Sequence, residues 1–148
     1  MAFSISTGMA NHLMTGGSLK AGVDGKVIKI YAGPVPASAD AAIDPALHTL
    51  LCELSNGGDG TGVSMAGDPV NGIIGKAGAE IWKGTIAESG VASFFRFVAT
   101  DDDGAESDQA LRLQGSVGVL NADFLVGDAV FAAGDEQRCD SCNMGIPV

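Results

Sequence analysis

The chain has 148 residues, 46% of them hydrophobic, and a formal net charge of −10 at neutral pH. This length fits one ordinary domain, and the apolar fraction is high enough for a real core, which excludes an intrinsically disordered protein. The basic residues are scattered along the chain without a patch that would hold phosphates, so direct binding to DNA or RNA is not expected. No apolar run reaches the roughly 18 residues of a membrane helix, and the first twenty residues lack the pattern of a signal peptide.

The apolar residues are mostly small ones, and 22 residues are glycine. Small side chains fill little volume, so such a chain often gains stability by association. The acidity would keep an abundant protein in solution before it assembles. An odd number of cysteines without a signal peptide argues against a disulfide framework and indicates a reducing compartment.

Residues 1–25 predict an N-terminal helical or extended arm. A helix with a broken middle is expected over 4–22, capped by Ser4 or Ser6 and ended or kinked by a Gly-Gly pair. We expect this segment to order when it docks on a partner. Its candidate contact residues, which lie outside the β pattern that follows, are Phe3, Ile5, Met9 and Leu13.

From residue 26 onward the hydrophobic period changes to two, which is typical of strands. The predicted strands are 27–32, 50–54, 62–66, 78–86, 92–100, 109–120, 122–132 and 144–148. The segments between them are rich in Gly, Asp, Asn, Ser and Pro, which favour turns. This spacing predicts an all-β domain over 26–148, a β-sandwich or jelly roll, with one short helix at about 40–48 after the first strand.

The segment 81–98 predicts a β-hairpin with large apolar groups on both faces of its second strand. A strand in a monomeric sandwich usually has one polar face. We therefore expect cover on both sides, by the opposite sheet and by either the N-terminal helix or another subunit. This makes Phe94, Phe95 and Phe97 candidate interface residues. Trp82 is expected in the core, with a role as a partner anchor as the alternative.

The stretch 26–42 reads KVIKIYAGPVPASADAA, a strand that runs into a proline turn and a helix start. With a preceding short helix, a strand like 49–54, a Gly-rich middle and a tryptophan hairpin like 81–97, it resembles small proteins encoded among the head and tail genes of tailed bacteriophages. The resemblance covers most of the chain. It implies a structural protein of a virus particle and brings no catalytic residues with it.

The acidic loop Asp101-Asp102-Asp103-Gly104 is the sharpest polar cluster in the sequence. A calcium loop places its carboxylates at alternate positions, and three adjacent aspartates do not reproduce that spacing. A solvated turn, in which Gly104 supplies a positive φ, is therefore favoured over a calcium site. We expect no metal and no other cofactor.

Two cysteines, Cys139 and Cys142, have the spacing of half a zinc site or of a redox pair. Cys52 with His12 or His48 could complete a set of four zinc ligands, but nothing in the sequence brings them together. No βαβ pattern supports a thioredoxin-like pair. Two ordinary thiols in a turn are the favoured interpretation, and oxidation of the pair in aged particles is a further alternative.

Candidates for catalysis are few, and no serine lies in a G-x-S-x-G motif. Glu80 and Glu88 flank Trp82 and could be imagined as a glycosidase pair, but acids beside a hairpin turn are more often solvated. We expect no catalytic residues and no enzymatic activity.

The sequence thus predicts a virion structural protein of a tailed phage, assembled in the host bacterial cytoplasm. A capsid decoration (cement) protein is the first choice, acting through a trimer or other closed oligomer of itself and through contacts with the shell. A tail or tail-tip component, in contact with tail proteins, is the alternative. A host-surface or carbohydrate-binding module is a second alternative, for which the chain offers the aromatics Trp82 and Tyr31.

Overall fold

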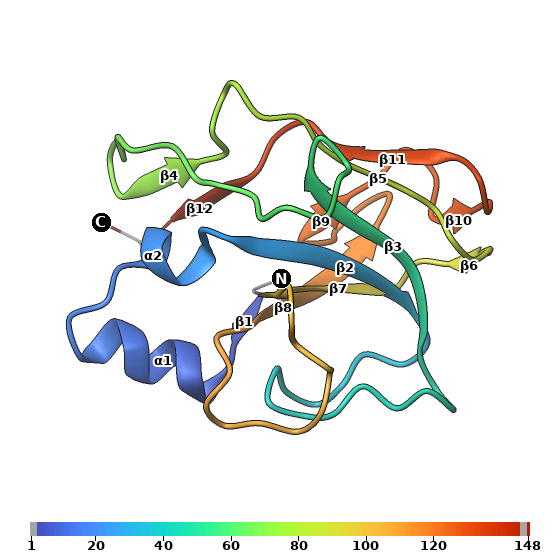
Figure 1. Cartoon of the computed structure of the whole chain (residues 1–148), viewed down its shortest axis with the longest axis horizontal. Helices are drawn as coiled ribbons and strands as arrows, with labels where there is room; N and C mark the ends of the chain where they lie inside the picture. Colours follow the sequence, from blue (N-terminus) through green and yellow to red (C-terminus); the bar gives the residue numbers. More distant parts are fainter. Residues whose placement is uncertain (1–2, 146–147) are drawn as a thin grey trace.

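The computed structural model describes residues 3–145 and 148 (Figure 1). It confirms the expected all-β class with a small helical part near the N-terminus. In chain order the elements are β1 (Ser4–Ile5), α1 (Thr7–Met14), α2 (Leu19–Val23), β2 (Lys26–Ala32), β3 (Thr49–Asn56), β4 (Ile73–Gly75), β5 (Trp82–Thr85), β6 (Gly90–Val91), β7 (Phe94–Ala99), β8 (Leu113–Gly118), β9 (Phe124–Leu125), β10 (Val130–Phe131), β11 (Glu136–Cys139) and β12 (Asn143–Gly145).

Most of the strands belong to one eight-stranded sheet with the order β1-β8-β7-β2-β3-β5-β11, to which β9 adds by parallel pairing with β8. The long strand β2 lies at its centre, antiparallel to β3 on one side and to β7 on the other. Two small two-stranded sheets, β6 with β10 and β4 with β12, complete the described strands. β-Branched and aromatic residues fill β2 and β7, which suits strands buried on both faces.

The large sheet rolls up, so that its β5 end lies over its β7 half. The Trp82 ring of β5 meets the Phe97 ring of β7 edge-on at a centroid distance of 6.3 Å, although β2 and β3 separate these strands within the sheet. The main core lies between the two halves and includes Ile28, Leu54 and Leu113. The two facing layers that a sandwich predicts are therefore halves of a single rolled sheet. Trp82, 1% exposed, is in the core, as predicted.

The outer face of the β7 half is covered by two long loops, 33–48 and 100–112. Phe94 stacks on Tyr31 at 5.0 Å, and His48 from the first loop packs edge-on against Phe94 at 5.3 Å. The chain thus covers both faces of β7 itself, by its own loops on one side and by its own rolled sheet on the other.

The N-terminal segment consists of two helices rather than one, and over the described residues it packs on the sheet. Ser6 caps α1 by accepting a hydrogen bond from the Met9 N–H, and Ser18 caps α2 in the same way from Ala21. Between the helices Gly16 adopts a φ of +95°, which ends α1 where the Gly-Gly pair predicts a break. β1 pairs with β8, and Met9 is 1% exposed within the core. Residues 3–25 are therefore part of the domain, not an arm that waits for a partner.

The short helix expected at 40–48 is wrong, because this stretch forms turns. Pro45 disfavours the helical conformation of Asp44 and cannot donate to the carbonyl of Ala41. That carbonyl accepts a hydrogen bond from Arg96 instead, at 2.8 Å. A tertiary contact thus replaces the bond that a helix would have made.

The hairpin expected over 81–98 is also wrong. β5 pairs with β3 and β11, whereas β7 pairs with β2 and β8. The connection between them leaves the sheet and forms β6, which pairs with β10. Local alternation marked both strands correctly, but it carries no information about which strands become neighbours. The strand expected at 62–66 is reduced to an isolated bridge between Met65 and Lys76.

Gly84 of β5 lies where β3 approaches most closely, and its replacement by alanine should destabilise the protein by about 1–3 kcal/mol. An added Cβ would lie 1.9 Å from the Glu53 carbonyl oxygen, a backbone atom that cannot move without disturbing β3. Urea unfolding followed by circular dichroism measures the loss. Gly67→Ala is the matched control, because its Cβ would meet nothing within 4 Å, and its midpoint should stay close to that of the unsubstituted chain. Equal midpoints for the two variants would contradict the close approach.

Candidate functional site

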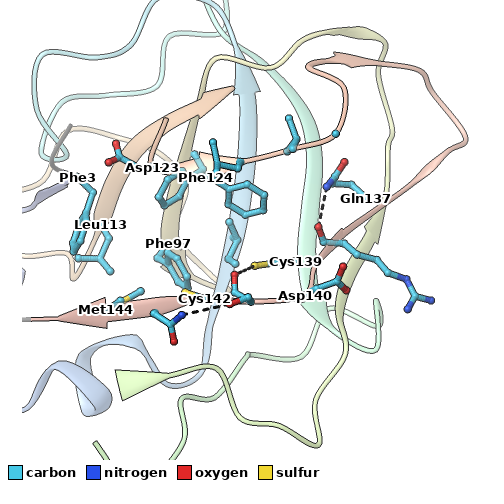
Figure 2. Close-up of a pocket in the computed structure, with 18 of the residues that line it drawn as sticks. Phe3, Phe97, Leu113, Asp123, Phe124, Gln137, Cys139, Asp140, Cys142 and Met144 are labelled. Carbon is cyan, nitrogen blue, oxygen red and sulfur yellow. Dashed lines mark hydrogen bonds between the residues drawn. The ribbon is translucent and has the colours of Figure 1, made fainter. Parts of the chain in front are cut away.

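The candidate site is a cavity of about 750 Å³ between the two ends of the rolled sheet (Figure 2). Its floor is apolar and is built by the central strands. Ile28 of β2, Phe95 and Phe97 of β7 and Leu113 of β8 form this floor, and each is less than 9% exposed. These side chains point inward because they occupy alternate positions of paired strands, with Ile28 opposite Phe97 and Phe97 opposite Leu113.

The walls of the cavity come from the two terminal edges of the sheet. One wall is β9 with the residues that follow it, and Phe3 stands beside it at the β1 edge. The other wall is β11 with the segment 140–144. β1 and β9 both pair with β8 at one end of the sheet, and β11 is the last strand at the other end. The cavity is therefore the seam at which the rolled sheet would have to close in order to form a barrel.

The edge of β11 that does not pair with β5 presents backbone groups that no other strand of the described residues pairs with. Just before β11, the Asp135 carbonyl accepts a hydrogen bond from the Ile86 N–H at 2.8 Å. Hydrogen-bonded pairs alternate along an antiparallel ladder, so Gln137 bonds to β5 while the backbone groups of Glu136 and Arg138 point to the open edge. At that edge the Arg138 carbonyl accepts a hydrogen bond of 2.8 Å from the Gln137 side-chain amide (Figure 2).

The rim of the cavity carries more acids than bases. Arg138 donates from Nε to Glu136 at 2.7 Å, and this hydrogen bond lowers the pKa of the Glu136 carboxyl below its ordinary value. Asp123 accepts hydrogen bonds from the backbone and hydroxyl of Ser116. Glu136 also pairs with Lys83 at 3.5 Å, so the three carboxylates of Glu136, Asp123 and Asp140 face two cations and leave the rim negative.

Two of the three cysteines line the cavity. Cys139, Cys142 and the buried Cys52 are all free thiols, and the Cys139 thiol donates to the Ser141 carbonyl at 3.3 Å. Burial raises the pKa of Cys139 to about 11 and that of Cys142 to about 12. Among residues 3–145 and 148, no three His, Cys, Asp or Glu side chains are placed to hold a metal ion.

Labelling of Cys139 should therefore be slow in the folded protein. A pKa of about 11 leaves about one thiolate per thousand at pH 8, so reaction with iodoacetamide should be roughly a hundredfold slower than in the urea-unfolded chain. The rate should rise about tenfold per pH unit up to pH 10, because the thiolate fraction does. Mass spectrometry of the labelled peptides measures the ratio of the two rates and the dependence of the folded-state rate on pH. Equal rates in folded and unfolded protein would contradict this burial.

A second polar feature lies on the opposite face of the sheet and is called here the buried arginine cluster, formed by Arg96, Arg112, Asp102 and Gln114. Arg112 donates to both carboxylate oxygens of Asp102 at 2.7 and 2.8 Å. Arg96 donates to the Gln114 side chain and to the carbonyls of Ser38 and Ala41. The bonds of Arg96 attach the loop 33–48 to β7 and join β7 to β8, and the pair of Arg112 with Asp102 closes the loop 100–112 just before β8.

Arg96 is 1% exposed, and one of its guanidinium nitrogens has no hydrogen-bond partner among the described residues. Burial and the neighbouring Arg112 lower the pKa of Arg96 to about 10. The sequence signal for this cluster is an arginine between Phe95 and Phe97 in a strand that is apolar on both faces. Such a charge must be buried with partners, which identifies a loop anchor rather than a solvated residue.

The acidic loop divides into exposed and buried residues. Asp101 and Asp103 are exposed, and Gly104 has the expected positive φ of +78°. The expectation of a solvated turn is wrong for Asp102, whose side chain is 6% exposed, because Arg112 holds it inside.

The candidate interface residues separate into two groups. Phe3 and Ile5 are exposed, at 36% and 39%, and Leu13 is half-buried. The other candidates, Met9, Phe94, Phe95 and Phe97, are buried within the chain. Their assignment as interface residues is corrected, because the chain's own sheet and loops cover them.

Both histidines and Glu80 have structural partners, whereas Glu88 is exposed. The His48 ring accepts a hydrogen bond from the Asp44 N–H at Nδ1 and donates from Nε2 to the Pro34 carbonyl. His12 bonds to a backbone carbonyl in the α1–α2 connection. Glu80 is not a solvated acid, since its carboxylate accepts hydrogen bonds from the Trp82 indole and the Ser64 N–H. These contacts hold side chains in place and bring no acid, base and nucleophile together.

Comparison with family models, curated proteins and solved structures finds no match for this chain. In the part of the chain that the structure describes, no helix has the length and apolar character needed to cross a membrane.

Proposed function

We propose that this protein is a structural component of a tailed-bacteriophage particle, namely a capsid decoration (cement) protein that acts by contact with the shell and with copies of itself. The proposal combines the sequence resemblance with one observation, a set of exposed large apolar side chains along one edge of the sheet. We call this set the apolar edge, and it consists of Phe3, Ile5, Val119, Leu120 and Leu125.

The apolar edge follows β8 and its neighbours. β1 and β9 both pair with β8, and the turn between β8 and β9 carries Val119 and Leu120. Leu120 is 78% exposed and Leu125 is 63% exposed. Single exposed apolar residues are ordinary, but several along one sheet edge are typical of a contact surface. Burial of such an edge against a lattice would add stability with each copy and needs no catalytic group.

The alternatives have different support. A tail or tail-tip component would use the same apolar edge, so it remains the second candidate. A carbohydrate-binding module needs aromatic side chains on an exposed face, and Trp82 and Tyr31 are 1% and 7% exposed. The burial of both favours assembly over sugar binding.

Particles that lack this protein test the proposal. They should form with tails and should rupture at lower temperature than complete particles, and added purified protein should restore the rupture temperature. Leu120→Glu should abolish this restoration, because a charge would be buried at the contact. Val70→Glu is the matched control, since Val70 is 65% exposed and lies just before β4, which belongs to a separate two-stranded sheet with β12.

Three results would count against the proposal as stated. Particles that are tailless or unable to adsorb would replace the cement assignment with the tail alternative. Equal restoration by both glutamate variants would show that the apolar edge is not the contact. Failure of the unsubstituted protein to bind particles would exclude the decoration role.

A further inference from the structure

We propose that the seam between β9 and β11 binds an extended segment of a partner protein, which pairs with the open edge of β11 as an added β-strand and places alternate apolar side chains in the cavity. This inference rests on the proposed function, because it names the kind of partner that assembly would recruit at this site. The partner segment is basic as well as apolar.

The open edge of β11 has the hydrogen-bonding groups that strand addition requires. Glu136 and Arg138 direct their backbone N–H and carbonyl groups away from β5, and β11 has no second strand neighbour among the described elements. The Arg138 carbonyl is occupied by the Gln137 side-chain amide, at 2.8 Å. The N–H of an incoming strand would replace this local side-chain bond. Exposed sheet edges recruit extended peptides through such main-chain hydrogen bonds.

The cavity beside this edge suits the side chains of such a strand. An extended segment points every second side chain to the same face, so one face would meet the accessible lining residues Phe3, Phe124 and Leu125 while the other stays in solvent. The volume of about 750 Å³ lies within the range of roughly 300–1,000 Å³ that is typical of binding pockets. The buried floor residues, among them Phe97 and Leu113, lie beneath these accessible side chains.

The negative charge of the cavity rim favours a basic partner segment. The rim carries the carboxylates of Asp123, Asp140 and Glu136 against Arg138 and Lys83, which both pair with Glu136, so its net charge is negative and a segment with Lys or Arg beside its apolar residues is attracted. A second copy of this chain, with a net charge of −10, is a poor match for an acidic rim. The observations therefore favour a different protein as the donor of the strand.

A library of random octapeptides, displayed and selected on the purified full chain, provides the probe. We expect enrichment of peptides that alternate apolar and polar residues and carry Lys or Arg. Synthetic versions are then titrated by calorimetry and by the fluorescence of Trp82, whose ring lies 6.3 Å from the cavity residue Phe97. An Asp140→Asn substitution should weaken binding at low salt and reduce its salt dependence.

Two variants at one position test the backbone pairing. Arg138→Pro and Arg138→Ala both lose the ion pair with Glu136, but only proline removes the N–H at the open edge. We expect the proline variant to bind the selected peptides roughly tenfold more weakly than the alanine variant, the effect of one hydrogen bond. Circular dichroism checks that both variants fold. If the proline variant does not fold, peptides N-methylated at alternate positions give the same test, since methylation in one of the two registers should weaken binding roughly tenfold.

Absence of any enriched peptide would overturn the proposal, as would enrichment of sequences without alternation. Equal binding to the proline and alanine variants, with no effect of N-methylation in either register, would show that side chains alone fill the cavity and that no strand is added. The selection uses purified protein without particles, so its failure leaves the particle-restoration result, and with it the proposed function, to stand separately.

Discussion

Replacing Arg112 with methionine should lower the free energy of unfolding by about 3–5 kcal/mol. The guanidinium makes two hydrogen bonds to Asp102, and the two side chains are 2% and 6% exposed. Without it the carboxylate stays buried and unpaired, which is far less stable than either the intact pair or an apolar pair. Urea unfolding at pH 7 measures the loss. Arg138→Met is the matched control, because it breaks an exposed ion pair and should leave the midpoint nearly unchanged.

The effect of this substitution should depend on pH. Burial opposes ionisation of Asp102, but hydrogen bonds from Arg112 and from the Gly104 N–H outweigh it, and the pKa of Asp102 lies below its ordinary value. Such a carboxyl stabilises the fold above its unfolded pKa of about 3.9, and this stabilisation is lost as the pH falls through the lower, folded pKa.

In the methionine variant the unpaired carboxyl is easier to protonate, so acid relieves the buried charge. The difference in stability between the two proteins should be largest near pH 7 and should shrink as the pH falls toward 4. A difference that stays constant over this range would contradict the role assigned to the pair.

Replacing Phe97 with alanine should destabilise the protein by about 3–5 kcal/mol. Phe97 is 3% exposed and meets the rings of Phe95 and Trp82 at 6.0 and 6.3 Å, so its removal leaves a cavity between the halves of the rolled sheet. Urea unfolding gives the magnitude, and Trp82 fluorescence reports the change in packing. Phe3→Ala removes the same atoms from a side chain that is 36% exposed, and its effect on stability should be well under half as large.

This pair of variants also separates core from interface among the aromatic residues. If Phe97 served another subunit instead of the core, its alanine variant would unfold at the same urea concentration as the unsubstituted monomer. Phe3→Ala should instead weaken restoration of particle stability while the monomer stays folded. The reverse pattern would contradict the burial of β7 by its own chain.

Several features of the fold follow from short stretches of sequence. The cap at Ser6, the break at Gly16, the strand 26–32 and the positive φ of Gly104 each depend on residues within a few positions of one another. In the same way, the alternation of β-branched and aromatic residues identifies β7 as a strand whose two faces are both buried. These features are predictable because their physical causes, namely capping, steric freedom and side-chain period, are local.

The candidate site follows from long-range pairing and was not predictable in this way. β11 has the polar sequence Glu-Gln-Arg-Cys, and it is a strand because β5 offers it a free edge. The seam exists because the sheet rolls until Trp82 reaches Phe97 across two intervening strands. Neither the pairing of β11 with β5 nor the contact between Trp82 and Phe97 can be predicted from the neighbouring residues along the chain.

The difference between local causes and long-range contacts also explains two wrong predictions, those for Asp102 and for the stretch 40–48. An acidic loop and an alanine-rich segment favour a solvated turn and a helix when only neighbours along the chain are considered. In the folded protein Arg112 buries Asp102, and Arg96 takes the carbonyl that a helix would have used. The chain's composition and local periods thus determine its class, its strands and its caps. Which strands pair, and whether each charged side chain is buried or exposed, depends on which surfaces meet when the sheet rolls up. The reason is that burial and hydrogen bonding act between residues distant in sequence.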